Sequence, residues 1–138
     1  MAVSQSKAGS ISGLRVLIVE DEPVLAMCLG EVIEGEGGVI AGTAYSIAEA
    51  QTLVAAAEFD VAVLDLNLHG QPVGVIASAI IARGNRIIFS TGCSASAVPA
   101  EFAGWPVLSK PYSDVAVLAA LAQADNRPAL SLETDVAA

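Results

Sequence analysis

The chain has 138 residues, of which 54% are hydrophobic: this is enough for one domain with one core and too short for two. Its 15 acidic residues outnumber the 6 lysines and arginines, which are scattered along the chain, so we expect no nucleic-acid partner. No apolar run approaches the ~20 residues that span a bilayer, and the Ser- and Gly-rich start lacks the apolar centre of a signal peptide. We therefore expect a cytoplasmic protein with no membrane partner.

Five short apolar runs rich in β-branched residues predict five strands. The first, third and fourth runs are apolar almost throughout, which is typical of strands that are covered on both faces of a parallel sheet. The predicted strands span Arg15–Val19, Val39–Thr43, Val61–Leu64, Arg86–Phe89 and Pro106–Leu108.

Segments with helical spacing lie between these runs. In the first of them the apolar stripe is predicted to include Cys28 as a core residue, and the second begins with a Ser-x-x-Glu capping box, Ser46 and Glu49. The fourth is weak because Pro99 interrupts it. The predicted helices span Pro23–Gly35, Ser46–Glu58, Val73–Arg83, Ser94–Ala103 and Asp114–Ala124.

The fivefold alternation of strand and helix predicts an α/β fold, a (βα)₅ doubly wound parallel sheet with helices on both faces. We assign this domain to residues 14–124. Residues 1–13 are predicted to be a flexible N-terminal segment and residues 125–138 a C-terminal tail.

Polar residues follow four of the predicted strands. In an open parallel sheet ligands bind at the carboxyl ends of the strands, so these residues are expected to converge. They are Glu20 and Asp21 after the first strand, Asp65 and Asn67 after the third, Thr91 after the fourth and Lys110 after the fifth.

The three carboxylates would repel one another and their pKa values would rise unless a cation bound between them. Oxygen ligands of this kind suit Mg²⁺ or Mn²⁺. Lys110 and Thr91 would then supply a positive charge and a hydroxyl group for phosphoryl oxygens, which leaves Asp65 as a nucleophile for in-line phosphoryl transfer. Asp21 could instead cap the helix that begins at Pro23, and the two roles are compatible.

Four motifs resemble the receiver domain of two-component response regulators, over Leu14 to about Ala124. They are the acidic pair Glu20–Asp21, "LDLNL" around Asp65, "FSTG" around Thr91 and "LSKPY" around Lys110. Each motif alone is weak, but four in this order, each at a strand end, are highly specific.

The resemblance implies a flavodoxin-like strand order 2-1-3-4-5 and phosphorylation of Asp65 by a sensor histidine kinase or a histidine phosphotransfer protein. It implies that Mg²⁺ is held by Glu20, Asp21, Asp65 and the backbone carbonyl of Asn67. It also implies that Thr91 and Lys110 bind the phosphoryl group, and that the Lys110–Pro111 bond is cis.

The sequence departs from the common receiver pattern at Val107, where many receivers carry an aromatic switch residue. The "FSTG" and "PVLSKPY" stretches are similar to a variant class of receivers, described by a Phe-Ala-Thr-Gly motif, whose members are often stand-alone. We therefore expect phosphorylation to be reported through the Thr91–Cys93 loop and the weak fourth helix. By the same resemblance, Asn67 and Cys93 tune the lifetime of the phosphoryl group.

The resulting hypothesis is a phosphorelay signalling module, not an enzyme beyond intrinsic phosphotransfer and autodephosphorylation, which acts through an unknown downstream protein. The alternative is a metal-dependent phosphohydrolase of the haloacid dehalogenase type, which also forms an aspartyl phosphate. That class needs Asp-x-Asp after the first strand, where this chain has Glu20–Asp21–Glu22. A nucleotide-binding module is disfavoured because no Gly-rich loop follows the first strand. We expect His69 to be solvated and Tyr112 to pack beside the last helix.

Overall fold

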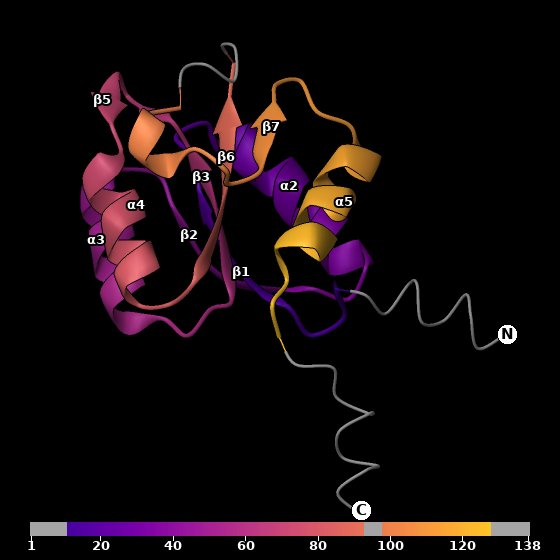
Figure 1. Cartoon of the computed structure of the whole chain (residues 1–138). Helices are drawn as coiled ribbons and strands as arrows, with labels where there is room; N and C mark the ends of the chain where they lie inside the picture. Colours follow the sequence, from indigo (N-terminus) through magenta and orange to yellow (C-terminus); the bar gives the residue numbers. More distant parts are fainter. Residues whose placement is uncertain (1–10, 93–97, 128–138) are drawn as a thin grey trace, which may run out of the picture.

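The computed structural model describes residues 11–92 and 98–127, and a five-stranded parallel sheet forms their centre (Figure 1). The order in the sheet is β2-β1-β3-β6-β7, which is 2-1-3-4-5 when the five strands are numbered along the chain. The predicted fold class and strand order are thus confirmed. The strands are β1 (Arg15–Val19), β2 (Val39–Ala44), β3 (Val61–Asp65), β6 (Arg86–Thr91) and β7 (Val107–Ser109).

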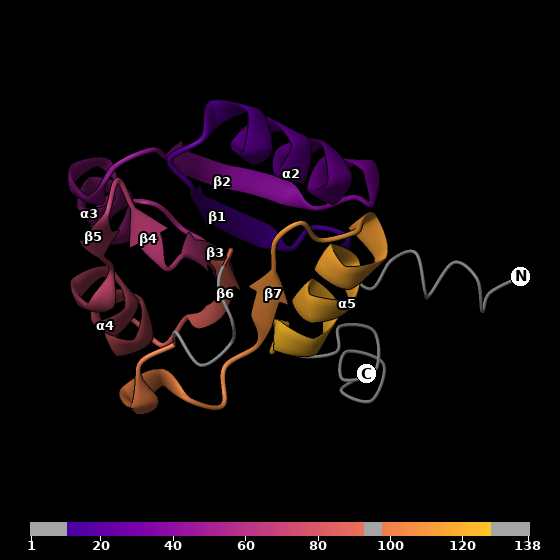
Figure 2. The same cartoon turned by 90° about the horizontal axis from the view of Figure 1, so that it is seen from above.

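Two pairs of helices cover the two faces of the sheet, as Figure 2 shows from above. On one face lie α2 (Pro23–Gly35) and α5 (Asp114–Ala124), and on the other lie α3 (Ile47–Ala56) and α4 (Gly74–Ala82). Successive residues of the central strand alternate between the two cores: Val63 packs on the α2 and α5 side and Leu64 on the other. Burial on both faces explains why the strand sequences are apolar throughout.

Side-chain caps fix the starts of two helices. At α3, Ser46 Oγ accepts the backbone N–H of Glu49 at 3.1 Å, which confirms the predicted capping box. The reciprocal bond of Glu49 Oε1 is to the backbone N–H of Tyr45, one residue before the cap, at 2.7 Å. At α5, Ser113 Oγ accepts a backbone N–H in the first turn. No described side chain caps α2, so the alternative interpretation of Asp21 as a cap is wrong.

Cys28 is exposed, so its prediction as a core residue is wrong. The buried positions of α2 are Ala26, Leu29 and Ile33, which repeat every three or four residues. Cys28 lies about 100° around the helix from Leu29 and falls outside this stripe.

A short hairpin after β3 was not predicted. The two-residue strands β4 (Asn67–Leu68) and β5 (Gln71–Pro72) pair antiparallel. They are joined by His69 and Gly70, both with positive φ (51° and 79°). Positive φ at both central residues is the signature of a type I′ turn, the turn that suits a two-residue hairpin loop.

The connection between β6 and β7 differs from the predicted fourth helix. Its described part contains only the 3-10 turn η3 (Ala100–Phe102), while Cys93 and residues 94–97 lie outside the described residues. Phe102 is buried, with its ring centroid 5.7 Å from that of Phe89 on β6. This aromatic contact anchors η3 to the sheet.

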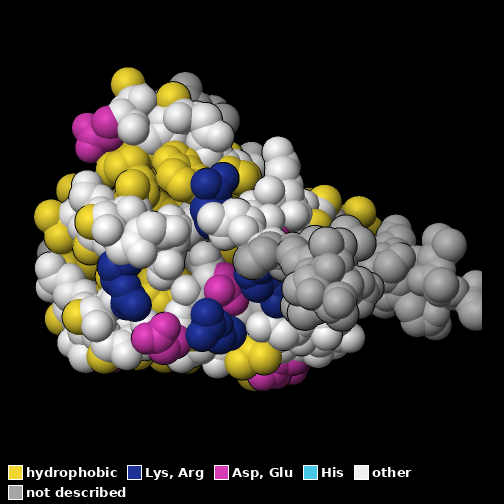
Figure 3. Space-filling view, turned by 60° about the horizontal axis from the view of Figure 1, so that its bottom comes forward, with side chains coloured by type: hydrophobic (Ala, Val, Ile, Leu, Met, Phe, Trp, Pro, Cys, Tyr) yellow, Lys and Arg dark blue, Asp and Glu magenta, His cyan; other side chains and the backbone are white. Residues whose placement is uncertain are grey.

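The face at the bottom of the view in Figure 1 carries mixed charges. On the face shown in Figure 3, Lys and Arg side chains are interspersed with acidic ones and form no continuous basic surface. Within the described ranges, no helix is long and apolar enough to cross a membrane.

Candidate functional site

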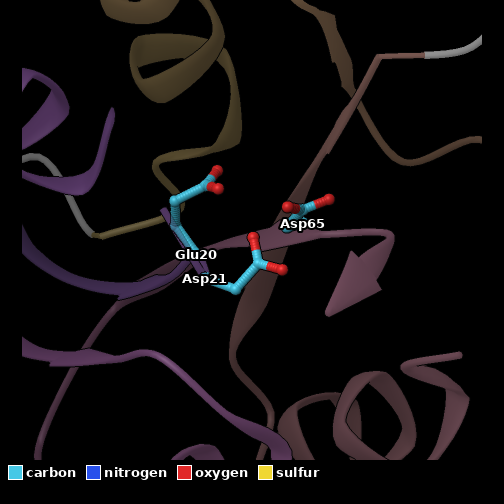
Figure 4. Close-up of side chains that lie close together, drawn as sticks. All are labelled: Glu20, Asp21 and Asp65. Atoms are coloured by element: carbon cyan, nitrogen blue, oxygen red, sulfur yellow. The ribbon is translucent and has the colours of Figure 1, made fainter. Parts of the chain in front are cut away.

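Three carboxylates gather at the carboxyl ends of β1 and β3 (Figure 4). Glu20 and Asp21 follow β1, and Asp65 is the last residue of β3. One carboxylate oxygen from each lies within 4.8 Å of the other two. Glu20 and Asp65 are buried, with 3% and 5% of their surface exposed, whereas Asp21 is only partly covered. The parallel pairing of β1 with β3 produces this convergence, because it brings two strand ends to one edge.

Lys110 places its ammonium group between two of these carboxylates. Its Nζ atom lies 3.0 Å from Glu20 Oε1 and 3.1 Å from Asp65 Oδ2. The backbone N–H of Lys110 donates to the carbonyl of Thr91 at 2.8 Å, which ties the loop after β7 to the end of β6. The peptide bond from Lys110 to Pro111 is cis, as predicted.

Burial and charge act in opposite directions on the ionisable groups of the site. Burial alone would lower the pKa of Lys110, but its hydrogen bonds with Glu20 and Asp65 outweigh this effect and raise it. Burial raises the pKa of Glu20; Lys110 opposes that rise and the negative charge of Asp65 adds to it. The single ammonium group of Lys110 therefore does not fully offset the unfavourable burial and mutual repulsion of the Glu20 and Asp65 carboxylates.

This donor set fits a hard divalent cation. The carboxylate oxygens of Glu20, Asp21 and Asp65 could hold Mg²⁺, which is bound by few protein oxygens and keeps other positions for water or phosphate. A cation there would also favour the charged form of Glu20, the group whose pKa burial raises.

The other predicted site residues lie at the same edge of the sheet. Asn67 directly follows Asp65, and its backbone N–H donates to Asp65 Oδ1 at 3.0 Å. Thr91 ends β6 and is buried, and its neighbour Ser90 pairs with Asp65 in the register of the sheet. The structure thus brings all six residues to one edge. The role of the Asn67 carbonyl stays a prediction.

Sequence reasoning missed a contact of His69 with the site. Its backbone N–H donates to Asp21 Oδ2 at 2.8 Å, and its imidazole Nε2 lies 3.1 Å from the carbonyl oxygen of Tyr45. The side chain is 61% exposed, so it lies at the rim of the site in contact with solvent, as expected. The His69–Gly70 dipeptide was the signal available, because a residue that tolerates positive φ followed by Gly is a common two-residue hairpin turn.

Tyr112 packs where it was expected. It lies against the core beneath α2 and α5 and is partly buried. Burial raises the pKa of its hydroxyl group, and the negative charge of Glu20 adds to the rise. Its ring forms one wall of the hollow between the two helices.

Comparison with known proteins shows the family to which the chain belongs. Residues 16–122 match the model of the response regulator receiver domain, so the chain belongs to the response regulator receiver domain family. It is therefore a member of a family of two-component signalling proteins.

Solved structures of receivers resemble the chain closely. The solution structure of SdrG from Sphingomonas melonis Fr1 shares 38% sequence identity at a TM-score of 0.72, covering 80% of this chain and 94% of that one. A structure of the BeF₃-activated conformation of SdrG, from Pseudomonas melonis Fr1, is 39% identical with a TM-score of 0.68, covering 80% and 98% of the two chains. The receiver domain of the PhyR response regulator from Erythrobacter litoralis is 27% identical with a TM-score of 0.75, covering 87% and 98%. The search of curated proteins gave no match.

Proposed function

We propose that Asp65 accepts a phosphoryl group from a phosphohistidine of a partner protein, in a reaction that requires Mg²⁺. The observation that carries this proposal is the convergence of Glu20, Asp21 and Lys110 on the buried carboxylate of Asp65. A bound Mg²⁺ would neutralise negative charge on the carboxylates and on the transferring phosphoryl oxygens. Its ligands would be Glu20, Asp21, Asp65 and the backbone carbonyl of Asn67.

In the reaction, a carboxylate oxygen of Asp65 attacks the phosphorus atom in line with the leaving nitrogen. A P–O bond forms, the P–N bond of the phosphohistidine breaks, and the electron pair of that bond stays with the imidazole. The hydrogen bond from the Asn67 backbone to Asp65 Oδ1 orients the carboxylate, so that Oδ2 is the oxygen that attacks.

Lys110 and Thr91 bind the product. The Lys110 ammonium group already lies 3.1 Å from Asp65 Oδ2, so a phosphoryl oxygen attached there comes within its reach. The Thr91 hydroxyl group, at the end of the neighbouring strand β6, supplies a second donor. Because both groups act on charge that arrives with the phosphoryl group, they also relay its presence to the loops after β6 and β7.

A hollow between α2 and α5 supports a protein as the phosphodonor. It has a volume of about 430 Å³ and borders on the site through Lys110. Its walls are largely apolar, and Val24 and Met27 on the outer face of α2 are 66% and 58% exposed. A helix of a sensor histidine kinase or histidine phosphotransfer protein could bury these side chains while its phosphohistidine reaches Asp65.

Phosphorylation would be reported by the segment after Thr91. Val107 on β7 is a small aliphatic residue that packs against the core on the α3 and α4 side, so it cannot act as an aromatic switch. Phe89 pairs with Val107 in the register of the sheet, and its ring contacts that of Phe102 on η3. We infer that this turn transmits the change to a downstream protein. Identical backbone chemical shifts at η3 before and after phosphorylation would contradict this step.

The test is incubation with acetyl phosphate and Mg²⁺, followed by intact-mass measurement. The wild type is expected to gain one phosphoryl group, and Asp65→Asn none. The related SdrG has been solved in a BeF₃-activated conformation, which supports the use of BeF₃⁻ as a phosphoryl analogue on this chain as well. Steady hydrolysis of a generic phosphate ester would favour the phosphohydrolase alternative, which the family membership disfavours.

A further inference from the structure

We propose that His69 is a positioning residue that holds Asp21 in the orientation needed to bind the cation. This inference rests on the proposed function, because it assigns a role in the same site. His69 lies 48 positions from Asp21 in the sequence, yet its backbone N–H donates a hydrogen bond to the Asp21 carboxylate.

The hairpin turn gives His69 its place. With φ at 51°, its backbone N–H is directed at Asp21 Oδ2 and lies 2.8 Å from it. The imidazole Nδ1 lies 3.6 Å from the same oxygen, too far for a hydrogen bond, so the backbone N–H is the group that holds the Asp21 carboxylate. This hydrogen bond fixes Oδ2 of a carboxylate that has one oxygen within 4.8 Å of oxygens of Glu20 and Asp65.

The imidazole is itself held from the other side. Its Nε2 lies 3.1 Å from the carbonyl oxygen of Tyr45, which can only accept, so Nε2 is the donor. The backbone N–H of Tyr45 donates to Glu49 in the capping box of α3. Both polar groups of the Tyr45 backbone are therefore engaged. The imidazole ties the hairpin turn to this fixed point at the start of a helix, and so holds the His69 backbone N–H against Asp21.

Such support controls metal affinity in general. Carboxylate ligands are held by hydrogen bonds from groups that do not touch the metal, and removing such groups typically weakens metal binding by about 10–100-fold. Mg²⁺ is particularly demanding because it requires nearly ideal octahedral geometry. Of the three carboxylates, Asp21 is the most exposed, and Lys110 contacts only the other two. Asp21 therefore depends most on an additional contact.

Glycine is the informative substitution. In His69→Gly the residue still adopts positive φ without strain and keeps the backbone N–H, so the loss is confined to the imidazole and its bond to Tyr45, which fixes the turn. His69→Asn is a second variant, because Asn also tolerates positive φ. Gln71→Ala is the matched control: Gln71 lies in the same hairpin, is exposed, and pairs through its backbone with Leu68.

The experiment measures Mg²⁺ affinity by titration calorimetry and thermal unfolding in EDTA. We expect both His69 variants to bind Mg²⁺ about 10-fold more weakly than the wild type, while Gln71→Ala binds normally and all four proteins unfold at similar temperatures in EDTA. We also expect saturating Mg²⁺ to restore the phosphorylation rate of His69→Gly with acetyl phosphate, a rescue that general structural damage would not show.

The possible failures are distinguishable. If the wild type binds Mg²⁺ and His69→Gly binds it equally well, the positioning role is wrong and the proposed function stands. A loss of phosphorylation that saturating Mg²⁺ does not restore also overturns the positioning role. If the wild type itself binds no Mg²⁺ and gains no phosphoryl group, the proposed function fails and this inference fails with it.

Discussion

Neutralising Asp21 should stabilise the fold in the absence of divalent cations and abolish the response to Mg²⁺. The substitution Asp21→Asn keeps the shape of the side chain and an oxygen that can accept the His69 backbone N–H. It removes one of three negative charges whose nearest oxygens lie within 4.8 Å of one another. Repulsion among these charges lowers the stability of the fold at a site that function requires.

The expected gain in stability can be worked out from the 4.8 Å separation of the carboxylate oxygens. For two full charges 4.8 Å apart, an effective dielectric constant of about 20 gives a repulsion of about 3.5 kcal/mol per pair. Lys110 offsets part of the field at Glu20 and Asp65, and the 19% exposure of the Asp21 side chain lets water reduce it further. We therefore expect a gain of about 1–2 kcal/mol in the free energy of unfolding, which corresponds to roughly 4 °C per kcal/mol in the unfolding midpoint.

Thermal unfolding in EDTA and in excess Mg²⁺ measures both effects. In EDTA, Asp21→Asn should unfold at a higher temperature than the wild type; adding Mg²⁺ should raise the midpoint of the wild type and leave that of the variant unchanged. Glu31→Gln is the control, because it makes the same change in net charge at an exposed position of α2. The reasoning is refuted if Asp21→Asn is less stable than the wild type in EDTA, or if it responds to Mg²⁺ as the wild type does.

Three further predictions test other parts of the account. Burial would raise the pKa of Asp60, but the hydrogen bonds from Arg15 outweigh this effect and lower the pKa. The contribution of Asp60 to stability is therefore complete above the usual carboxyl range, and it is lost as the pH falls through the lowered pKa. Urea unfolding should show Asp60→Asn to be less stable at neutral pH by about 1–2 kcal/mol and equal to the wild type in strong acid; an equal difference at both pH values would contradict this. Phe102→Ala should cost about 3 kcal/mol in urea unfolding because it removes the contact with Phe89, and a loss below 1 kcal/mol would show that η3 is not anchored there. Met27→Asp should slow phosphotransfer from a phosphohistidine protein about 5-fold or more without changing the rate with acetyl phosphate, and equal slowing with both donors would exclude a docking role.

The sequence was sufficient to predict the sheet and the place of the site. Strands buried on both faces must be apolar throughout, so their runs stand out from the periodic helices. Because the strands are parallel, the polar residues that end them meet at one edge, and the positions of Asp65 and Lys110 follow from the order of the elements.

Contacts between distant loops were not predictable in the same way. The hydrogen bond from His69 to Asp21 depends on the two-residue turn and on the spacing of β1 and β3, and no periodicity in the sequence encodes either. The exposure of Cys28 shows a related limit: a helix with many apolar residues allows more than one buried stripe, and packing against the sheet selects among them.

The connection between β6 and β7 is a third feature in which the structure differs from the sequence prediction. Pro99 and the small residues around it weaken the helical pattern, and within residues 98–103 the backbone forms only η3. The segment is held instead by tertiary packing: Phe102 is buried, and Val98 and Trp105 pack against the same core. Local helix propensity is therefore a poor guide where tertiary contacts hold a short segment.

The central claim is that Asp65 accepts one phosphoryl group in a reaction that depends on Mg²⁺. The most direct measurement is the intact mass of the full chain after incubation with acetyl phosphate, with Mg²⁺ or with EDTA, followed by peptide mapping. We predict the mass of one added phosphoryl group on the peptide containing Asp65 with Mg²⁺, and none with EDTA or in Asp65→Asn. An unchanged mass of the wild type with Mg²⁺, or an added group that persists in Asp65→Asn, would contradict the account.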